Sequence, residues 1–241
     1  MDIARAAAAL VVVEYLALDP VLSIDEALRR KSFTSPPQIM RRGNSIQGIS
    51  DARHQISGEV RCGGQDHFYL ETHIALAVPQ EDRDMLVYSS TQHPTEVQHG
   101  VATVLGVPVN AVTTEIRRMG GGFGGKESQS TIIAALAALL AAQARRPVKL
   151  RLSRDDDMVI TGKRHDFLFR YQAGFDDNGR IEGIDILMAS RAGNVADLSS
   201  SVLIRALCHA DNAYYLPNAH IHGYPCKTNT VSNTGFRGFG G

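Results

Sequence analysis

Two glycine-rich segments are the places in this sequence where bare backbone could bind a polar ligand. The first, GGGFGG, covers residues 120–125, and the second, GFRGFGG, covers residues 235–241. Glycine costs conformational entropy on folding, so such clusters serve turns with positive φ or close approach of the backbone to a ligand. Backbone N–H groups in loops of this kind form concave anion-binding sites. Together, the two segments indicate one polar, phosphate-bearing ligand bound between them.

The first segment also fits a nucleotide-binding pattern. Gly120, Gly122 and Gly125 match G-x-G-x-x-G between an expected strand and an expected helix, as in folds that bind a dinucleotide. However, the expected strand carries charge, whereas central parallel strands are almost wholly apolar. Glu127 at the start of the helix would repel a pyrophosphate. A dinucleotide-binding protein is therefore a distant alternative, and a tight turn without any ligand stays open for either segment.

Composition excludes several classes of function. The 241 residues carry 25 Lys and Arg against 25 Asp and Glu, so no net field favours nucleic acid, and no basic amphipathic run favours a membrane surface. Cys62, Cys208 and Cys226 are an odd count without C-x-x-C, which argues against disulfides, a zinc site or an iron–sulfur cluster on this chain. We expect a cytoplasmic protein. The histidines show no metal-ligand spacing, and we interpret His220 and His222 as surface residues of a strand.

The elements that would position the glycine segments mix strands and helices without strict alternation, which predicts an α+β fold. Ser23 and Glu26 have the spacing of a capping box at the start of a short helix, and we expect Asp197 to cap a later helix. The N-terminal residues predict a short helix that runs into a buried strand. Strands are expected over 54–62, 67–79, 84–91, 110–118, 147–154, 167–175 and 180–190, and helices over 94–106, 127–146 and 198–210. The helix over 127–146 is apolar around most of its circumference and is expected to be buried.

Several motifs resemble the molybdopterin-binding part of molybdenum hydroxylases of the xanthine dehydrogenase type. They are GGQDHFYLET (63–72), STQHPTEVQ (90–98), RRMGGGFGGKE (117–127), ITGKRHDF (160–167), RALCHADNAYYLPN (205–218) and KTNTVSNTGFRGFGG (227–241), in the order and at the spacings of that family. The resemblance covers essentially the whole chain. It implies the first molybdopterin-binding domain over 46–241, a linker over 32–45, and a remnant of the preceding α/β-hammerhead domain over 1–31.

The resemblance also implies a cofactor, molybdenum held by molybdopterin, buried between domains. It places Gln92 beside the metal, where its amide donates a hydrogen bond without ligating, so no residue of this chain is expected to ligate the metal directly. The backbone of Gly122, Phe123, Gly124 and Arg237 is implied to contact the cofactor. Iron–sulfur clusters and FAD are expected on other domains or subunits.

The activity implied by the resemblance is oxidation of a purine, hypoxanthine or xanthine to urate, in purine catabolism. In the family a metal-bound hydroxide attacks the substrate carbon while hydride passes to the metal's sulfido group. Arg205 is implied to stabilise the negative charge that develops on the ring. Glu127 would hydrogen-bond the purine edge, and Phe239 would pack on the bound ring.

One part of the family's machinery has no match in this sequence. The essential glutamate base lies in a C-terminal half that the 241 residues do not include. We therefore expect the isolated chain to be inactive, and to function only with a complementing molybdopterin-domain chain and with iron–sulfur and FAD subunits. The alternative is a non-catalytic, truncated remnant of such a gene.

Overall fold

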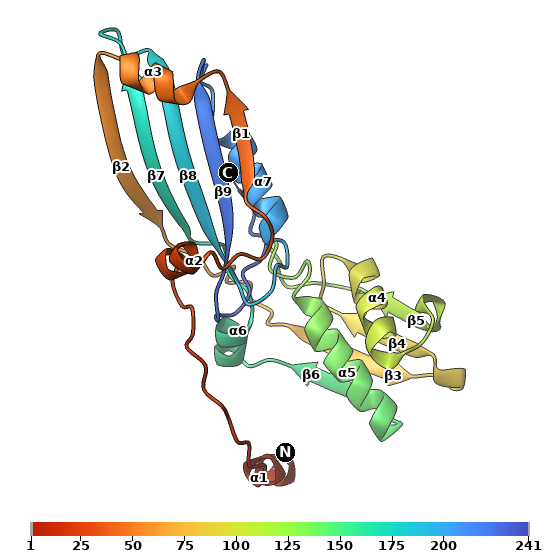
Figure 1. Cartoon of the computed structure of the whole chain (residues 1–241). Helices are drawn as coiled ribbons and strands as arrows, with labels where there is room; N and C mark the ends of the chain where they lie inside the picture. The colour runs from red at the N-terminus through yellow and green to blue at the C-terminus, as the bar shows by residue number, and fades with distance from the viewer. Residues whose placement is uncertain (1, 241) are drawn as a thin grey trace.

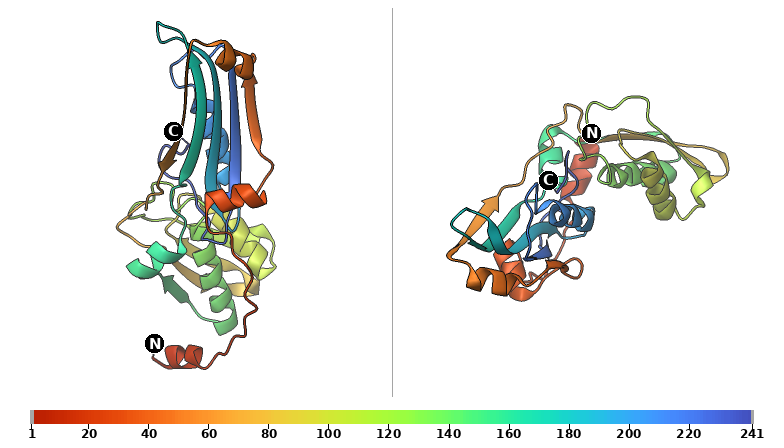
Figure 2. Two further views of the ribbon diagram at one scale, coloured as in Figure 1. Left: turned by 60° about the vertical axis from the view of Figure 1, so that its left-hand side comes forward. Right: turned by 90° about the horizontal axis from the view of Figure 1, so that it is seen from above.

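The computed structural model describes residues 2–240, which form two lobes, each built on one β-sheet (Figure 1). The first sheet has five strands in the order β1-β9-β8-β7-β2, and the second has four in the order β5-β4-β3-β6. Figure 2 shows the two lobes meeting only through loops and short helices near the middle of the molecule. The mixed α+β class is confirmed.

The five-stranded sheet is built around a long hairpin. Its strands are β1 (Gln38–Arg42), β2 (His54–Cys62), β7 (Phe167–Phe175), β8 (Ile181–Gly193) and β9 (Ala219–Lys227). β7 pairs with β8 in an antiparallel register, and β8 pairs with β9 in parallel. The parallel pair needs a crossover, which α7 (Ser199–His209) provides. Met188, Ala206, Leu207 and Ile221 pack between α7 and the sheet.

Two short helices lie around this sheet, α2 (Ile24–Arg30) and α3 (Ser45–Asp51). A third, α6 (Arg154–Ile160), lies below it in Figure 1, where Asp157 accepts hydrogen bonds from Tyr69 and His73. The capping box is confirmed, because Ser23 Oγ accepts a hydrogen bond from the backbone N–H of Glu26. The segment expected as a linker over 32–45 contains β1, which pairs with β9. It is therefore part of the sheet and not an irregular connection, while the domain boundaries stay a prediction.

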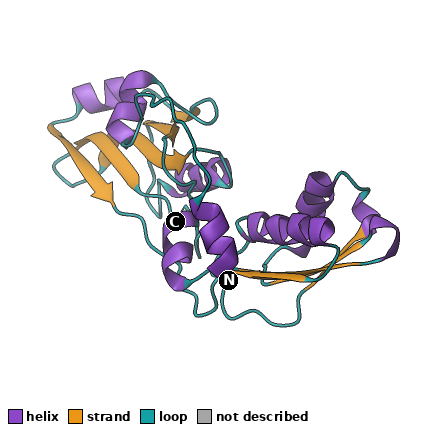
Figure 3. Cartoon of the chain, turned by 90° about the horizontal axis from the view of Figure 1, so that it is seen from below, coloured by secondary structure: helices purple, strands orange, loops and turns teal. Residues whose placement is uncertain are grey.

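The four-stranded sheet carries its helices on one face, as Figure 3 shows. Its strands are β3 (Ile74–Pro79), β4 (Met85–Ser89), β5 (Val112–Glu115) and β6 (Val148–Arg151), and the helices are α4 (Pro94–Leu105) and α5 (Ser130–Ala144), with one-turn helices at Glu81–Arg83 and Val109–Ala111. Alanines let α5 approach the sheet closely: Ala134, Ala137 and Ala138 are completely buried. The three-residue or four-residue spacing of these alanines places them on one face.

Two sequence expectations about apolar segments are wrong. Residues 10–20 form no strand, and side chains such as Val12 and Leu16 are each 89% exposed. A strand needs a neighbour to satisfy its backbone groups, and α1 (Asp2–Ala9) with its following segment extends away from both lobes (Figure 1). α5 is also not buried all round, since Ile132, Leu136 and Leu140 face outward. Apolar residues on every side of this helix therefore did not mean that every side is buried.

No helix within residues 2–240 combines the length and the apolar character needed to cross a membrane.

The packing of α5 predicts a position-dependent effect of one substitution. Ala137→Leu inserts three carbons where the side chain has no exposed surface, and it should lower the free energy of unfolding by about 1–3 kcal/mol. Ala142→Leu, on the exposed side of the same helix, should change it by less than about 0.5 kcal/mol. Urea denaturation of both variants measures the difference. Equal losses would show that α5 does not pack through this face.

Candidate functional site

The two glycine segments lie in contact with each other. The backbone N–H of Arg237 donates a hydrogen bond of 2.8 Å to the carbonyl oxygen of Phe123. A Cβ added to Gly124 would stand 2.7 Å from the carbonyl oxygen of Gly235, closer than real Cβ contacts allow. Gly124 also has a φ of +96°, which L side chains rarely adopt. The first segment follows β5 and the second follows β9, so each lobe contributes one of them.

The first segment curls through residues with positive φ. Gly121 has a φ of +100° and Phe123 has a φ of +53°, an unusual conformation for a phenylalanine. Within residues 2–240 the N–H groups of Gly122 and Phe123 donate to no acceptor. Such a curled run of free N–H groups is the backbone geometry that binds anions.

Gln92 is held against this segment by its own side chain. Its Oε1 accepts hydrogen bonds from the backbone N–H groups of Gly124, at 2.8 Å, and of Lys126, at 3.3 Å. Two N–H donors fix the orientation of the amide, because only its oxygen accepts. The amide NH₂ therefore points away from the segment, and no partner for it is found in the described part of the chain. The structure thus brings Gln92 together with Phe123, Gly124 and Arg237.

A buried lysine anchors the first segment from behind, a feature that the sequence reasoning missed. Lys126 has no exposed surface, and its Nζ donates to the Glu71 carbonyl oxygen at 2.7 Å and to Ser90 Oγ at 2.9 Å. Glu71 Oε2 lies 3.2 Å from Nζ and accepts from the backbone N–H of Gly120 at 3.0 Å. Both residues fall in the recognised motifs, and the charge of Lys126 directly after the glycines was the available signal.

Burial and pairing act in opposite directions on the charge of each member of this pair. Burial opposes the charge of Glu71, but the hydrogen bonds from Ser90, Gly120 and Lys126 outweigh it and lower the pKa of the carboxyl. Burial lowers the pKa of Lys126 against the opposing effect of Glu71. Because a buried charge needs a partner, the pair ties the glycine segment to the start of β3 and the end of β4.

His67, also missed from the sequence, joins the two segments. It is 6% exposed, and its Nε2 donates a 2.7 Å hydrogen bond to the carbonyl oxygen of Gly235. A Cβ on Gly125 would stand 2.7 Å from the imidazole ring. Burial lowers the pKa of His67. One imidazole thus fills the space that a side chain on the first segment would occupy and holds the second segment in place.

Asp197 has a different role from the expected helix cap. α7 begins at Ser199 with Leu198 as the capping residue, while the Asp197 carboxylate accepts from Ser128 Oγ at 2.8 Å, Gln129 Nε2 at 2.6 Å and Thr234 Oγ1 at 2.8 Å. Its φ of +45° is unusual for a residue with a side chain. These bonds connect the start of α5 with the second glycine segment, so tertiary contacts outweigh the local capping preference.

The three substrate residues expected from the resemblance lie along the second segment, but they do not meet. Glu127 Oε2 lies 3.7 Å from a Cβ built on Gly235, at the beginning of the segment. Arg205 lies on α7 beside Gly240, at its end, and its Nε donates to His209 Nε2 at 2.7 Å. Phe239 is 37% exposed. No hydrogen bond or ion pair of the Glu127 side chain occurs within residues 2–240.

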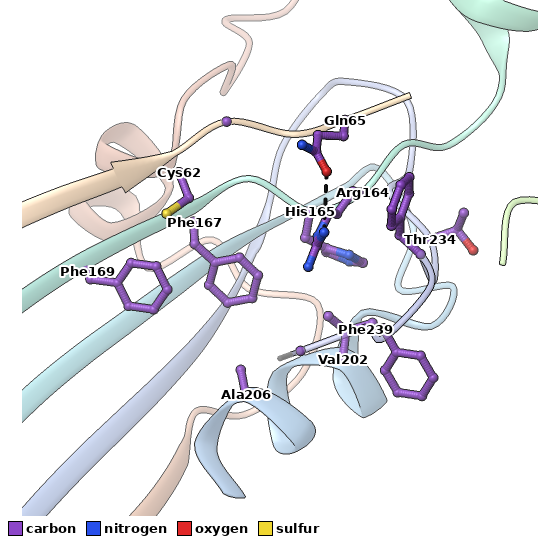
Figure 4. Close-up of a pocket in the computed structure, with 13 residues that line it drawn as sticks. Cys62, Gln65, Arg164, His165, Phe167, Phe169, Val202, Ala206, Thr234 and Phe239 are labelled. Carbon is purple, nitrogen blue, oxygen red and sulfur yellow. Dashed lines mark hydrogen bonds between the residues drawn. The ribbon is translucent and has the colours of Figure 1, made fainter. Parts of the chain in front are cut away.

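Phe239 lines a cavity of about 300 Å³ between α7 and the start of β7. Figure 4 shows Val202 and Ala206 of α7 on one side, with Arg164 and His165 opposite. Gln65 Oε1 accepts from Arg164 at 3.3 Å. The wall is mostly apolar, with few polar groups, as in pockets that hold small molecules.

The order of the strands does not fit a dinucleotide-binding site. β5 is an edge strand, and the strand after α5, β6, lies at the opposite edge and pairs antiparallel with β3. Gly120, Gly122 and Gly125 therefore do not open a helix between adjacent parallel strands, as the dinucleotide fold demands. The interpretation as a dinucleotide-binding unit is wrong because strand order is a tertiary property.

The buried His165 predicts acid sensitivity of the site. It is 3% exposed and shares a 2.8 Å hydrogen bond between Nε2 and Ser199 Oγ. Burial lowers its pKa to about 4, although nearby Asp197 and Asp166 oppose the shift. Below about pH 6.5 the unfolded chain protonates this histidine, whereas the native state does not. The free energy of unfolding that this histidine contributes is therefore fully present above that pH and is lost as the pH falls toward 4.

Urea unfolding at pH 7.5 and pH 5 measures this effect. Protonation of His165 in the unfolded chain should lower the free energy of unfolding by about 2 kcal/mol between pH 7.5 and pH 5. His165→Gln should remove that part of the pH dependence. His99→Gln, at an exposed position, is the control and should retain it. An unchanged pH dependence in His165→Gln would contradict the assignment.

Comparison with known proteins identifies the family. The sequence profile of the molybdopterin cofactor-binding domain matches residues 31–241. The chain is 47% identical to the xanthine dehydrogenase/oxidase of Gallus gallus over 238 residues, 98% of this chain and 18% of that protein. It is also 47% identical to the xanthine dehydrogenase of Drosophila subobscura over 241 residues, 99% of this chain and 18% of that protein. The chain thus spans less than a fifth of the length of these relatives.

Solved structures show the same fold at lower identity. Aldehyde oxidoreductase from Desulfovibrio gigas superposes with a TM-score of 0.87 and 23% identity, covering 98% of this chain and 27% of that one. Quinoline 2-oxidoreductase from Pseudomonas putida 86 superposes with a TM-score of 0.86 and 21% identity, covering 99% and 32%. These findings establish that the chain belongs to the molybdopterin cofactor-binding domain family.

Proposed function

We propose that this chain forms one wall of the molybdenum–molybdopterin site of a purine-oxidising hydroxylase. The observation that carries the proposal is the closure of the two glycine segments, through Arg237 N–H and the Phe123 carbonyl, beside an outward-facing Gln92 amide. Membership of the molybdopterin cofactor-binding domain family indicates the cofactor. Relatives named xanthine dehydrogenase support a purine as the substrate.

The residues present fit such a cofactor. A buried group rich in oxygen and nitrogen acceptors requires donors without bulky side chains in the way. The free N–H groups of Gly122 and Phe123 and the Gln92 amide offer them. Gly124 leaves no room for a Cβ, so that stretch of the wall is backbone alone. Gly122, Phe123, Gly124 and Arg237 would hold the pterin through their backbone, with Gln92 nearest the molybdenum.

The substrate residues have distinct proposed roles. When bound, the molybdenum centre supplies the oxidation of a substrate carbon. Glu127 would orient the purine through a hydrogen bond to its edge, since its carboxylate has no other polar partner in the described chain. Phe239 would pack against the ring face. Arg205 would stabilise negative charge on the ring, using the terminal amino groups that its contact with His209 leaves unused.

The remaining machinery is proposed to lie elsewhere. A complementing molybdopterin-domain chain would supply the general base, and iron–sulfur and FAD subunits would carry electrons away. In this scheme residues 46–241 form the first molybdopterin-binding domain, 32–45 connect it, and 1–31 belong to the preceding α/β-hammerhead domain. The chain would act in purine catabolism in the cytoplasm, a location supported by three free cysteines.

A test on the chain itself addresses the cofactor. Gly124→Ala adds a Cβ against Gly235 at a φ of +96°, and Gly179→Ala adds one at a φ of +76° in open space away from the site. Both should cost similar backbone strain, but only Gly124→Ala should abolish pterin retention. The measurement is the fluorescence of oxidised pterin released from chains expressed in a molybdopterin-producing host. Equal retention in the two variants would contradict the proposed wall.

A second test addresses the substrate in the chain assembled with the complementing chain and the iron–sulfur and FAD subunits. Glu127→Ala should lower kcat/KM for xanthine by about 10-fold to 100-fold, the value of one charged hydrogen bond. For an aldehyde, which lacks that edge, the loss should be less than about threefold. Glu115→Ala on β5 is the control and should change neither. Equal losses for both substrates would remove the argument for a purine, and no turnover with any partner would favour a non-catalytic remnant.

A further inference from the structure

A cluster of two histidines and one aspartate lies on the five-stranded sheet. His220 and His222 are two residues apart on β9, so their side chains stand on the same face of the sheet. Asp185 on the neighbouring strand β8 is in register with His220. The cluster lies in the half of the sheet near the β7–β8 turn, at the opposite end from the glycine segments (Figure 1). Both histidines lie on a strand and are partly exposed, as expected, and each also contacts Asp185.

The donor atoms of these side chains converge. Asp185 Oδ2 lies 2.9 Å from His220 Nδ1 and 3.3 Å from His222 Nε2, and Asp185 Oδ1 lies 3.1 Å from His222 Nε2. Zinc binds imidazole nitrogen and carboxylate oxygen at about 2.0–2.2 Å, so neighbouring ligand atoms around a tetrahedral ion lie roughly 3.3–3.6 Å apart. The ligand atoms of the three side chains all lie within 4.8 Å of one another, so small side-chain shifts would place them around one ion.

The surroundings suit an ion that enters from solvent. The side chains of His220, His222 and Asp185 are 18%, 21% and 31% exposed. The cluster faces away from α7, because Ile221 between the histidines packs beneath that helix. His220 Nε2 is buried and has no hydrogen-bond partner within the described chain.

We propose that Asp185, His220 and His222 form a binding site for a divalent ion of the zinc type, which bridges β8 and β9. Two imidazoles and one carboxylate suit zinc, cobalt or nickel, whereas magnesium and calcium prefer oxygen ligands alone. Three ligands leave further coordination positions to water. The site is separate from the proposed molybdopterin wall and does not depend on it.

The test is calorimetric titration of Zn²⁺ into the full chain after treatment with EDTA. One equivalent should bind, and Mg²⁺ should not compete. His222→Asn and Asp185→Asn should each weaken binding by at least about 100-fold. The control is His54→Asn, because His54 Nε2 lies 2.8 Å from Asp177 Oδ1 in an exposed pair that has the same chemistry without a second imidazole. That variant should bind Zn²⁺ like the parent chain.

Cobalt provides a readout that does not depend on stability. Co²⁺ bound at this site should give visible absorption bands that Zn²⁺ displaces, and His222→Asn should abolish the bands while circular dichroism shows an unchanged fold. If Asp185→Asn fails to fold, His222→Asn decides the question, since it removes only one ligand at a partly exposed position. Absence of Zn²⁺ binding, or equal weakening by His54→Asn and His222→Asn, overturns the proposal.

Discussion

The close approach of two backbones at Gly124 and Gly235 is the constraint on which the rest of the site depends. The carbonyl oxygen of Gly235 occupies the volume where any other residue at position 124 would have its Cβ. The neighbouring hydrogen bond, from Arg237 N–H to the Phe123 carbonyl, is a contact between main chains as well. The glycines are therefore required for packing between the lobes, in addition to any role against a ligand. This explains why both segments lack side chains at the same place.

Backbone contacts alone would not hold two long loops in one conformation, and hydrogen bonds of buried polar side chains provide the additional restraint. Lys126 with Glu71 holds the first segment to the four-stranded sheet, and His67 holds the carbonyl of Gly235. Asp197 connects the start of α5 to Thr234. Each of these groups is costly to bury without partners, so the arrangement has few alternatives of similar energy. The outward face of the site can then remain open, with the free N–H groups and the Gln92 amide positioned in advance.

The two ends of the five-stranded sheet have different surroundings. At one end, β9 leads into the second glycine segment, and the site residues join the two lobes. At the other end, the face turned away from α7 carries Asp185, His220 and His222 in mutual contact. Elsewhere both faces are apolar, since one packs against α7 and the other against α2. The proposed cofactor site and the proposed metal site thus lie at opposite ends of one sheet.

Local sequence determined the strands, the helices and the chemical character of the site. Alternation identified β2 and β7 to the residue, Ser23 identified the start of α2, and the glycine motifs identified the two segments that meet. These features depend on neighbours within a few residues, where backbone sterics and periodicity act. The recognised motifs added Gln92 and Glu127 to the candidate site residues. Without the motifs, Gln92 would have been interpreted as a polar residue at the end of a strand and Glu127 as a charged residue at the start of a helix.

Only the tertiary structure decided which distant groups pair. Lys126 meets Glu71 across 55 positions, and His220 meets Asp185 across 35. Asp197 leaves the local cap of α7 for Ser128 and Gln129, because several charged hydrogen bonds outweigh one capping bond. Strand order likewise placed β5 at an edge and excluded the dinucleotide site. Such pairings form because the whole fold must bury its apolar side chains and pair its buried polar groups at the same time. A short stretch of sequence does not show which distant residue will become the partner.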